Sequence, residues 1–139
     1  MKMTRGLRNN NPLNIRRIVG TIWQGQLAEQ RDKKFVQFKS IEWGIRAACC
    51  ILKTYQRKYQ ATCVEDIITR WAPASENDTR KYVETVCRLT GFGGKERLEE
   101  SQLPALVCAM AFVECGAPIS KETINKAYSL YVKLKSNSK

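Results

Sequence analysis

The residue best placed for acid–base chemistry is Glu114, which directly follows an uncharged stretch from Leu103 to Val113. Apolar residues recur in this stretch at helical spacing, at Leu103, Leu106, Val107 and Met110. Glu114 continues this stripe, and Gly116 and Pro118 should end the helix beyond it. Apolar neighbours and the negative end of the helix dipole both favour the protonated carboxyl that a general acid needs. The alternative is a Glu that reaches solvent at a frayed helix end.

A second group of polar residues lies between Glu76 and Tyr82. Glu76 is the rival acid, because an expected loop position suits a site residue. Asp78 and Thr79 can form a polar wall of a cleft or can cap the helix that follows. Tyr82, one helical turn after Asp78, can point its phenol into that cleft or pack in the core.

The N-terminal segment is rich in asparagine and includes Asn10, Asn11 and Asn14, with Trp23 a little further along the chain. Asparagines before Pro12 usually form turns, because their side chains bond the nearby backbone. Amide groups beside an aromatic ring also match the hydroxyls and faces of sugars. These four residues are therefore candidates for carbohydrate binding.

The patterns predict one mainly α domain over residues 1–139, of the α+β class, with about five helices and a small N-terminal β-hairpin or sheet. Alternating apolar residues predict the strands, around Leu13–Ile18 and Phe35–Phe38. The expected helices are 40–59, 63–71, a third from the Asn77–Asp78 region to Gly91, the Glu114 helix, and 120–134.

The composition excludes several kinds of chemistry. With no histidine, the chain cannot use a Ser–His or Cys–His nucleophile or a mixed Cys/His zinc site, so we expect no metal and no cofactor. The six cysteines include no CxxC pair and fall mostly in apolar helical stretches, which favours buried free thiols. The net charge of +11 favours an anionic partner.

Nothing in the sequence predicts a membrane span, since no apolar run approaches roughly 20 residues. The first residues also lack the apolar core of a signal peptide. We therefore expect synthesis in the cytoplasm, and if the protein acts outside it, something other than a classical signal must deliver it.

Five separated motifs carry a resemblance: RGLRNNNPLNIRR, WQGQ, the FxxF of Phe35–Phe38, GIRAA and RWAPASENDTRKY. In this order they resemble a family of small phage and prophage proteins that are lysozyme-like peptidoglycan hydrolases or virion structural proteins. The resemblance implies a lysozyme-like fold that acts on the glycan strands of peptidoglycan. Without a signal peptide, a phage particle, a holin-type pore or a contact-dependent secretion apparatus would then deliver the protein to the cell wall, the last with an immunity protein. Glu114 and Gly116 match the Glu-x-Gly pattern of the catalytic helix, but they follow the expected sheet, which suggests a circular permutation.

On this interpretation Glu114 protonates the oxygen between MurNAc and GlcNAc. A second carboxylate, Glu76 or Asp78, would activate water and give a muramidase. Without one, the sugar's own 6-hydroxyl would attack and give a lytic transglycosylase, the mechanism we favour.

Two other functions compete with this one. A non-catalytic virion or wall-binding protein would keep the fold without turnover. A nucleic-acid-binding module would use the positive charge, but the basic residues are spread along the chain and no recognition motif is present.

Overall fold

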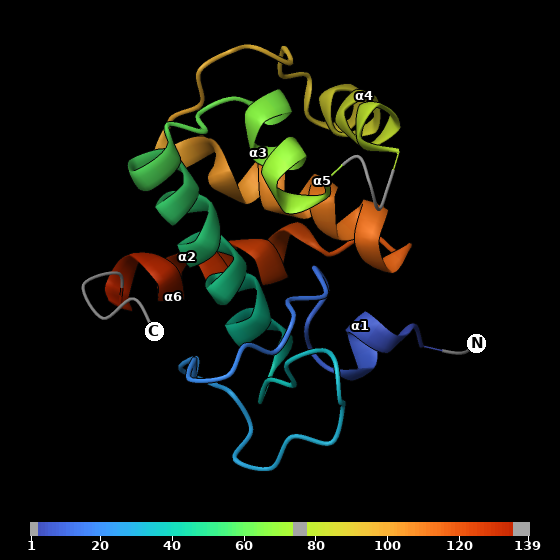
Figure 1. Cartoon of the computed structure of the whole chain (residues 1–139), viewed down its shortest axis with the longest axis vertical. Helices are drawn as coiled ribbons and strands as arrows, with labels where there is room; N and C mark the ends of the chain where they lie inside the picture. Colours follow the sequence, from blue (N-terminus) through green and yellow to red (C-terminus); the bar gives the residue numbers. More distant parts are fainter. Residues whose placement is uncertain (1–2, 74–77, 135–139) are drawn as a thin grey trace.

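The computed structural model describes residues 3–73 and 78–134 and is mainly helical (Figure 1). The mainly α prediction is confirmed. The helices are α1 (Arg5–Arg8), α2 (Ile41–Tyr59), α3 (Val64–Trp71), α4 (Thr79–Thr90), α5 (Leu103–Cys115) and α6 (Lys121–Leu134), with a short 3-10 helix, η1 (Glu100–Gln102), before α5.

Helix α5 forms the centre of the core and packs against α1, α2, α4 and α6. Leu103, Leu106, Val107 and Met110 are fully buried. Pro104 occupies the first turn, where a missing N–H costs nothing, and Gly116 ends the helix with a φ of 74°. The most apolar helix of the chain therefore carries Glu114 at its last turn.

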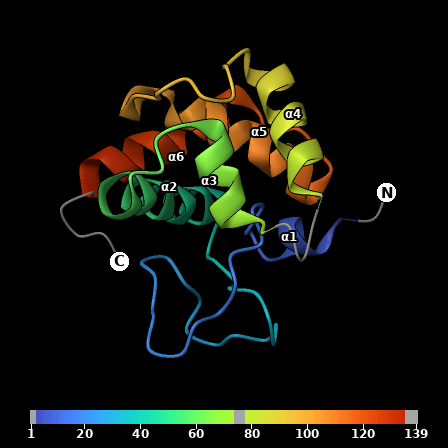
Figure 2. The ribbon, with the colours of Figure 1, turned by 45° about the horizontal axis from the view of Figure 1, so that its top comes forward.

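The α+β class and the expected N-terminal hairpin or sheet are wrong: across the described residues the chain forms no β-strand. The two expected strands meet only in isolated bridges, Arg16 with Phe35 and Gln26 with Phe38. The segment between α1 and α2 instead forms an irregular lobe below the helices in Figures 1 and 2. Its alternating apolar residues are nevertheless buried, at Leu13, Ile15, Val36 and Phe38.

Side-chain amides replace the missing sheet ladder. The Gln30 amide donates to the Gln37 carbonyl at 2.9 Å and accepts from the Gln37 N–H at 2.8 Å. Asn11, which is fully buried, accepts from the Ile15 N–H and donates to the carbonyls of Ile15 and Val36 at 2.9 to 3.0 Å. Because these bonds satisfy buried backbone groups, the lobe needs no regular strand pairing.

Asp32 joins this lobe to α1. Arg5 donates two hydrogen bonds to its carboxylate, each 2.8 Å long, and Asn9 donates a third at 3.0 Å. The backbone N–H groups of Lys34 and Phe35 add two more. The hydrogen bonds from Arg5 are the main reason that the pKa of Asp32 lies well below its usual value, although burial opposes the shift.

A close backbone contact fixes the asparagine segment against the start of α2. A Cβ atom at Gly44 would overlap the Asn10 carbonyl oxygen and would lie 3.2 Å from the Asn11 Cα. Only glycine therefore allows this approach.

Replacing Gly44 with alanine should lower the free energy of unfolding by about 2 kcal/mol, because overlap with rigid backbone outweighs the higher helix propensity of alanine. Denaturant unfolding measures the change. Gly93→Ala is the matched control, since its Cβ would meet only the Glu96 side chain, at an ordinary 3.6 Å. Equal effects at the two positions would contradict the prediction.

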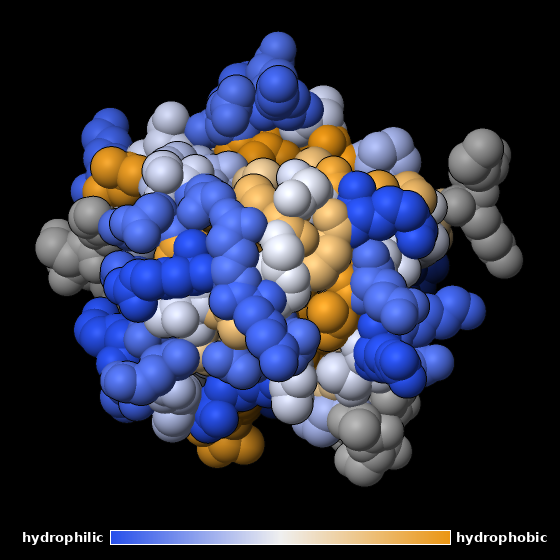
Figure 3. All heavy atoms as spheres, turned by 90° about the horizontal axis from the view of Figure 1, so that it is seen from above, coloured by the Kyte–Doolittle hydropathy of each residue, from blue (hydrophilic) through white to orange (hydrophobic). Residues whose placement is uncertain are grey.

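The surface seen from above is mostly hydrophilic, with an apolar strip between polar side chains (Figure 3). All six cysteines are free thiols, and four of them are buried. Among residues 3–73 and 78–134, no helix has both the length and the apolar character to cross a bilayer.

Candidate functional site

Glu114 lies half-buried at the last turn of α5, and two side chains from other helices donate hydrogen bonds to it. The Tyr82 hydroxyl of α4 donates at 3.0 Å and the Trp71 Nε1 of α3 donates at 3.3 Å. Both bonds end on Oε2. Among the residues that the structure describes, no hydrogen-bond donor is placed on Oε1.

The junction between α3 and α4 brings these two donors together. Trp71 is the last residue of α3, and the Thr79 hydroxyl at the start of α4 donates to the Ala72 carbonyl at 2.6 Å. Asp78 caps α4 by accepting the Lys81 N–H at 3.2 Å. Tyr82 follows Asp78 by one helical turn, which aims it at α5.

The Tyr82 hydroxyl is a stable donor. Burial raises the pKa of Tyr82 far above its usual value, and the adjacent Glu114 raises it further through its charge and by accepting the hydrogen bond. The phenol therefore keeps its proton at neutral pH and holds Oε2 in place.

The asparagine lobe reaches the same end of α5 through Asn14. A Cβ atom added at Gly6 of α1 would lie 3.0 Å from the Asn14 Oδ1 and 3.6 Å from the Cys115 Cβ, so these two residues flank one spot. The Asn14 Oδ1 is buried and has no hydrogen-bond partner within the described part of the chain. The Asn14 side chain therefore lies close to Gly6 and Cys115, and Cys115 directly follows Glu114 in the chain.

The other predicted sugar-binding residues of the lobe have structural contacts. Asn11 is buried in the backbone bonds described above, and Asn10 donates to the Phe38 carbonyl at 3.1 Å. Trp23 is only 8% exposed, so its ring offers little open face. Glu76 lies outside the described residues.

A pocket of about 350 Å³ extends from the Tyr82 side of the site. Its lining includes the predicted residues Asp78 and Tyr82, together with Lys81, Thr85, Phe112 and Val113. Glu114 does not line it, but Tyr82 both borders the pocket and bonds the carboxylate. Tyr82 therefore connects the pocket to Glu114.

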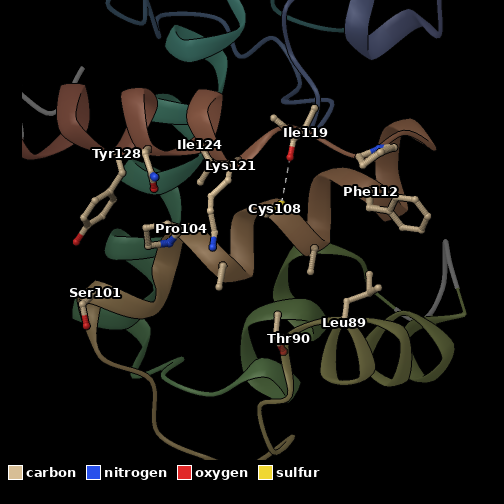
Figure 4. Close-up of a pocket in the computed structure, with 14 residues that line it drawn as sticks. Leu89, Thr90, Ser101, Pro104, Cys108, Phe112, Ile119, Lys121, Ile124 and Tyr128 are labelled. Atoms are coloured by element: carbon tan, nitrogen blue, oxygen red, sulfur yellow. Dashed lines mark hydrogen bonds between the residues drawn. The ribbon is translucent and has the colours of Figure 1, made fainter.

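A larger groove of about 780 Å³ lies elsewhere, between α4, α5 and α6 (Figure 4). Its α5 lining includes Cys108 and Phe112. Phe112 also lines the smaller pocket, but neither Tyr82 nor Glu114 lines the larger groove. We place the candidate site at Glu114, because the groove brings together no comparable acid–base group.

Trp71 is the site residue that sequence reasoning missed. It was expected only to end a helix, although it belongs to the RWAPASENDTRKY motif that also contains Asp78, Thr79 and Tyr82. Its indole N–H can only donate, so it supplements Tyr82 in fixing Oε2. A carboxyl group with one oxygen held and the other open can exchange a proton with a bound molecule.

Comparison with known proteins adds one relative. The chain matches no protein-family model. It is similar to protein P5 of Pseudoalteromonas phage PM2, with 42% identity over 127 residues, which cover 89% of this chain and 79% of that protein. At this identity and coverage, the chain belongs to the family of phage PM2 protein P5.

Proposed function

We propose that this protein cleaves the glycan strands of bacterial peptidoglycan, with Glu114 as the general acid. The observation that carries the proposal is the fixed Glu114 carboxyl, held through Oε2 by Tyr82 and Trp71 at the end of an apolar helix. The proposal also rests on the motif resemblance to small phage and prophage proteins that are lysozyme-like peptidoglycan hydrolases or virion structural proteins. The name of the phage relative says nothing of cleavage.

In this mechanism the open Oε1 carries the proton. It transfers that proton to the oxygen between MurNAc and GlcNAc as the bond to the sugar breaks and positive charge develops at C1. The Glu114 carboxylate then takes a proton from the attacking hydroxyl and is restored for the next turnover. The proton that Glu114 gives to the leaving oxygen is thus replaced by the proton of the attacking hydroxyl.

We infer a single-acid mechanism, in which the 6-hydroxyl of the sugar attacks and an anhydro product forms. Asp78 is already occupied as the helix cap, where its Oδ1 accepts the Lys81 N–H. A muramidase would need that residue or Glu76 to activate water. The Asp78 cap therefore favours the lytic transglycosylase.

The test is digestion of purified sacculi, with mass analysis of the released fragments. Anhydro-MurNAc ends support the transglycosylase, and reducing MurNAc ends would indicate a muramidase. Reducing GlcNAc ends would indicate cleavage of the other glycosidic bond. Release of nothing above a buffer control would refute the enzyme.

A non-catalytic virion or wall-binding role is the second candidate. It is favoured by the structural use of Asn10, Asn11 and Trp23, which leaves fewer groups free to hold a sugar. Binding of sacculi without release of soluble fragments would support this role. The anionic peptide stems of the wall suit a chain with a net charge of +11.

Replacing Tyr82 with phenylalanine should lower kcat about tenfold with little change in KM, because the ring stays while Oε2 loses one donor. The free energy of unfolding should fall by about 1 kcal/mol. Steady-state release of fragments from sacculi and denaturant unfolding measure the two effects. Tyr59→Phe, at an exposed tyrosine of α2, is the control. An unchanged kcat in Tyr82→Phe would exclude a positioning role for the hydroxyl.

A further inference from the structure

Three aliphatic side chains stand exposed together in the N-terminal lobe, where no core requires them. Ile18 is 63% exposed, Val19 is fully exposed and Ile22 is 76% exposed. We call these three residues the aliphatic tip. The lobe that carries them projects away from the helices in Figures 1 and 2.

The aliphatic tip is a hydrogen-bonded tight turn. The Thr21 N–H donates to the Ile18 carbonyl at 3.0 Å, and Gly20 has a φ of 89°, as a tight turn with Val19 at its apex requires. The chain on its N-terminal side is held by the hydrogen bond from the Arg17 N–H to the Lys34 carbonyl, 2.8 Å long. The three side chains are thus presented by a fixed backbone.

Basic residues surround this turn. Between positions 16 and 34 the chain carries five cations and two carboxylates. Arg16 and Arg17 precede the tip, and backbone contacts bring Lys34 and Phe35 beside them. Lys33 lines the same hollow as the aliphatic tip, together with Arg17. The tip therefore combines exposed apolar groups with a positive rim.

We propose that the aliphatic tip docks this protein on the surface of an anionic lipid bilayer. The three side chains enter the boundary between headgroups and acyl chains, and Arg17, Lys33 and Lys34 contact the anionic headgroups. Attachment is peripheral.

Other anionic partners fit the tip less well. Peptidoglycan and nucleic acid attract the cations, but neither offers an acyl layer in which Ile18, Val19 and Ile22 can be buried. A bilayer offers both, because it has charge at its surface and an apolar layer just beneath. An anionic bilayer is therefore the partner that matches both the aliphatic side chains and the basic residues.

The test is flotation of the full chain with lipid vesicles, made either from phosphatidylglycerol and phosphatidylcholine or from phosphatidylcholine alone. The triple variant Ile18→Ser, Val19→Ser and Ile22→Ser should bind the anionic vesicles about tenfold more weakly or worse, because the inserted apolar area is lost. The double variant Leu89→Ser and Val132→Ser removes exposed apolar groups elsewhere and should bind normally. Circular dichroism and thermal melting establish that each variant is folded.

A second pair of variants tests the charge. Lys33→Gln with Lys34→Gln should weaken binding severalfold and reduce its sensitivity to salt, whereas Lys58→Gln with Lys133→Gln, of equal charge, should have a smaller effect. Equal binding by the wild type and the triple serine variant would overturn the proposal. So would a loss of binding to sacculi or duplex DNA, and not to vesicles, in that variant. Cleavage of purified sacculi is not expected to depend on the tip, so this result is separable from the proposed enzyme.

Discussion

Replacing Glu114 with glutamine is expected to abolish the release of soluble fragments from purified peptidoglycan while the protein stays folded. Glutamine has nearly the same size, and its amide oxygen can still accept the bonds from Tyr82 and Trp71 that now reach Oε2. Its amide N–H groups are far too weakly acidic to protonate a leaving oxygen. The rate should fall by about a thousandfold or more, the upper part of the range for a lost acid–base group.

A control variant must show whether activity is lost because the acid is missing or because one negative charge is removed. Glu84→Gln on α4 removes a carboxylate that is exposed and forms only a loose ion pair with Arg80. This variant should keep full activity and nearly full stability. Melting temperatures establish that both variants are folded. Full activity in Glu114→Gln would remove the residue from the mechanism and would leave Glu76 as the candidate acid.

The helices could be predicted because their apolar residues recur at helical spacing and their ends carry specific residues. Gly91 and Gly116 end α4 and α5 in the left-handed conformation, as the sequence indicates. Ser120 caps α6, accepting the Thr123 N–H at 3.1 Å. These signals are local, and a helix makes its own backbone bonds, so no knowledge of distant partners is needed.

The N-terminal lobe could not be predicted in the same way. The pattern correctly marked Leu13, Ile15, Val36 and Phe38 as buried, although Ile18, at the end of the expected strand, is exposed. The same alternation suits a sheet or an irregular packed chain. The partners of the backbone are the amides of Asn11 and Gln30, which reach residues up to 25 positions away. Sequence spacing gives no sign of such contacts. The four-residue helix α1 was also missed, because the asparagines beside it favour turns.

The candidate site was partly predictable. The position of Glu114 follows from the periodicity of α5, and the choice of Tyr82 followed from its distance from the cap. The contact between these two side chains depends on how α4 packs on α5. The hydrogen bond from Trp71 to Glu114 depends on where α3 ends. Among the three asparagines, only the fold separates Asn14, beside Cys115, from Asn10 and Asn11, which bond the backbone.

Replacing Asn11 with alanine should cause the largest loss of stability of any single amide in the lobe. The change removes three hydrogen bonds at a site with no exposure and leaves the Ile15 N–H and the Val36 carbonyl without those partners, while the Ile15 carbonyl keeps the Val36 N–H. Each such group costs about 1 to 3 kcal/mol, so the free energy of unfolding should fall by about 3 to 5 kcal/mol.

Denaturant unfolding measures this loss, and Asn125→Ala on the exposed face of α6 is the control, since alanine suits a helix surface. A loss below about 1 kcal/mol in Asn11→Ala would mean that water or a shifted backbone replaces the amide. The consequence extends to Glu114, because the Asn11 carbonyl and the Asn14 side chain both border Gly6, beside Cys115. A variant that remains folded but has a loosened lobe should therefore also lose activity, which links the asparagine segment to the carboxyl group through packing.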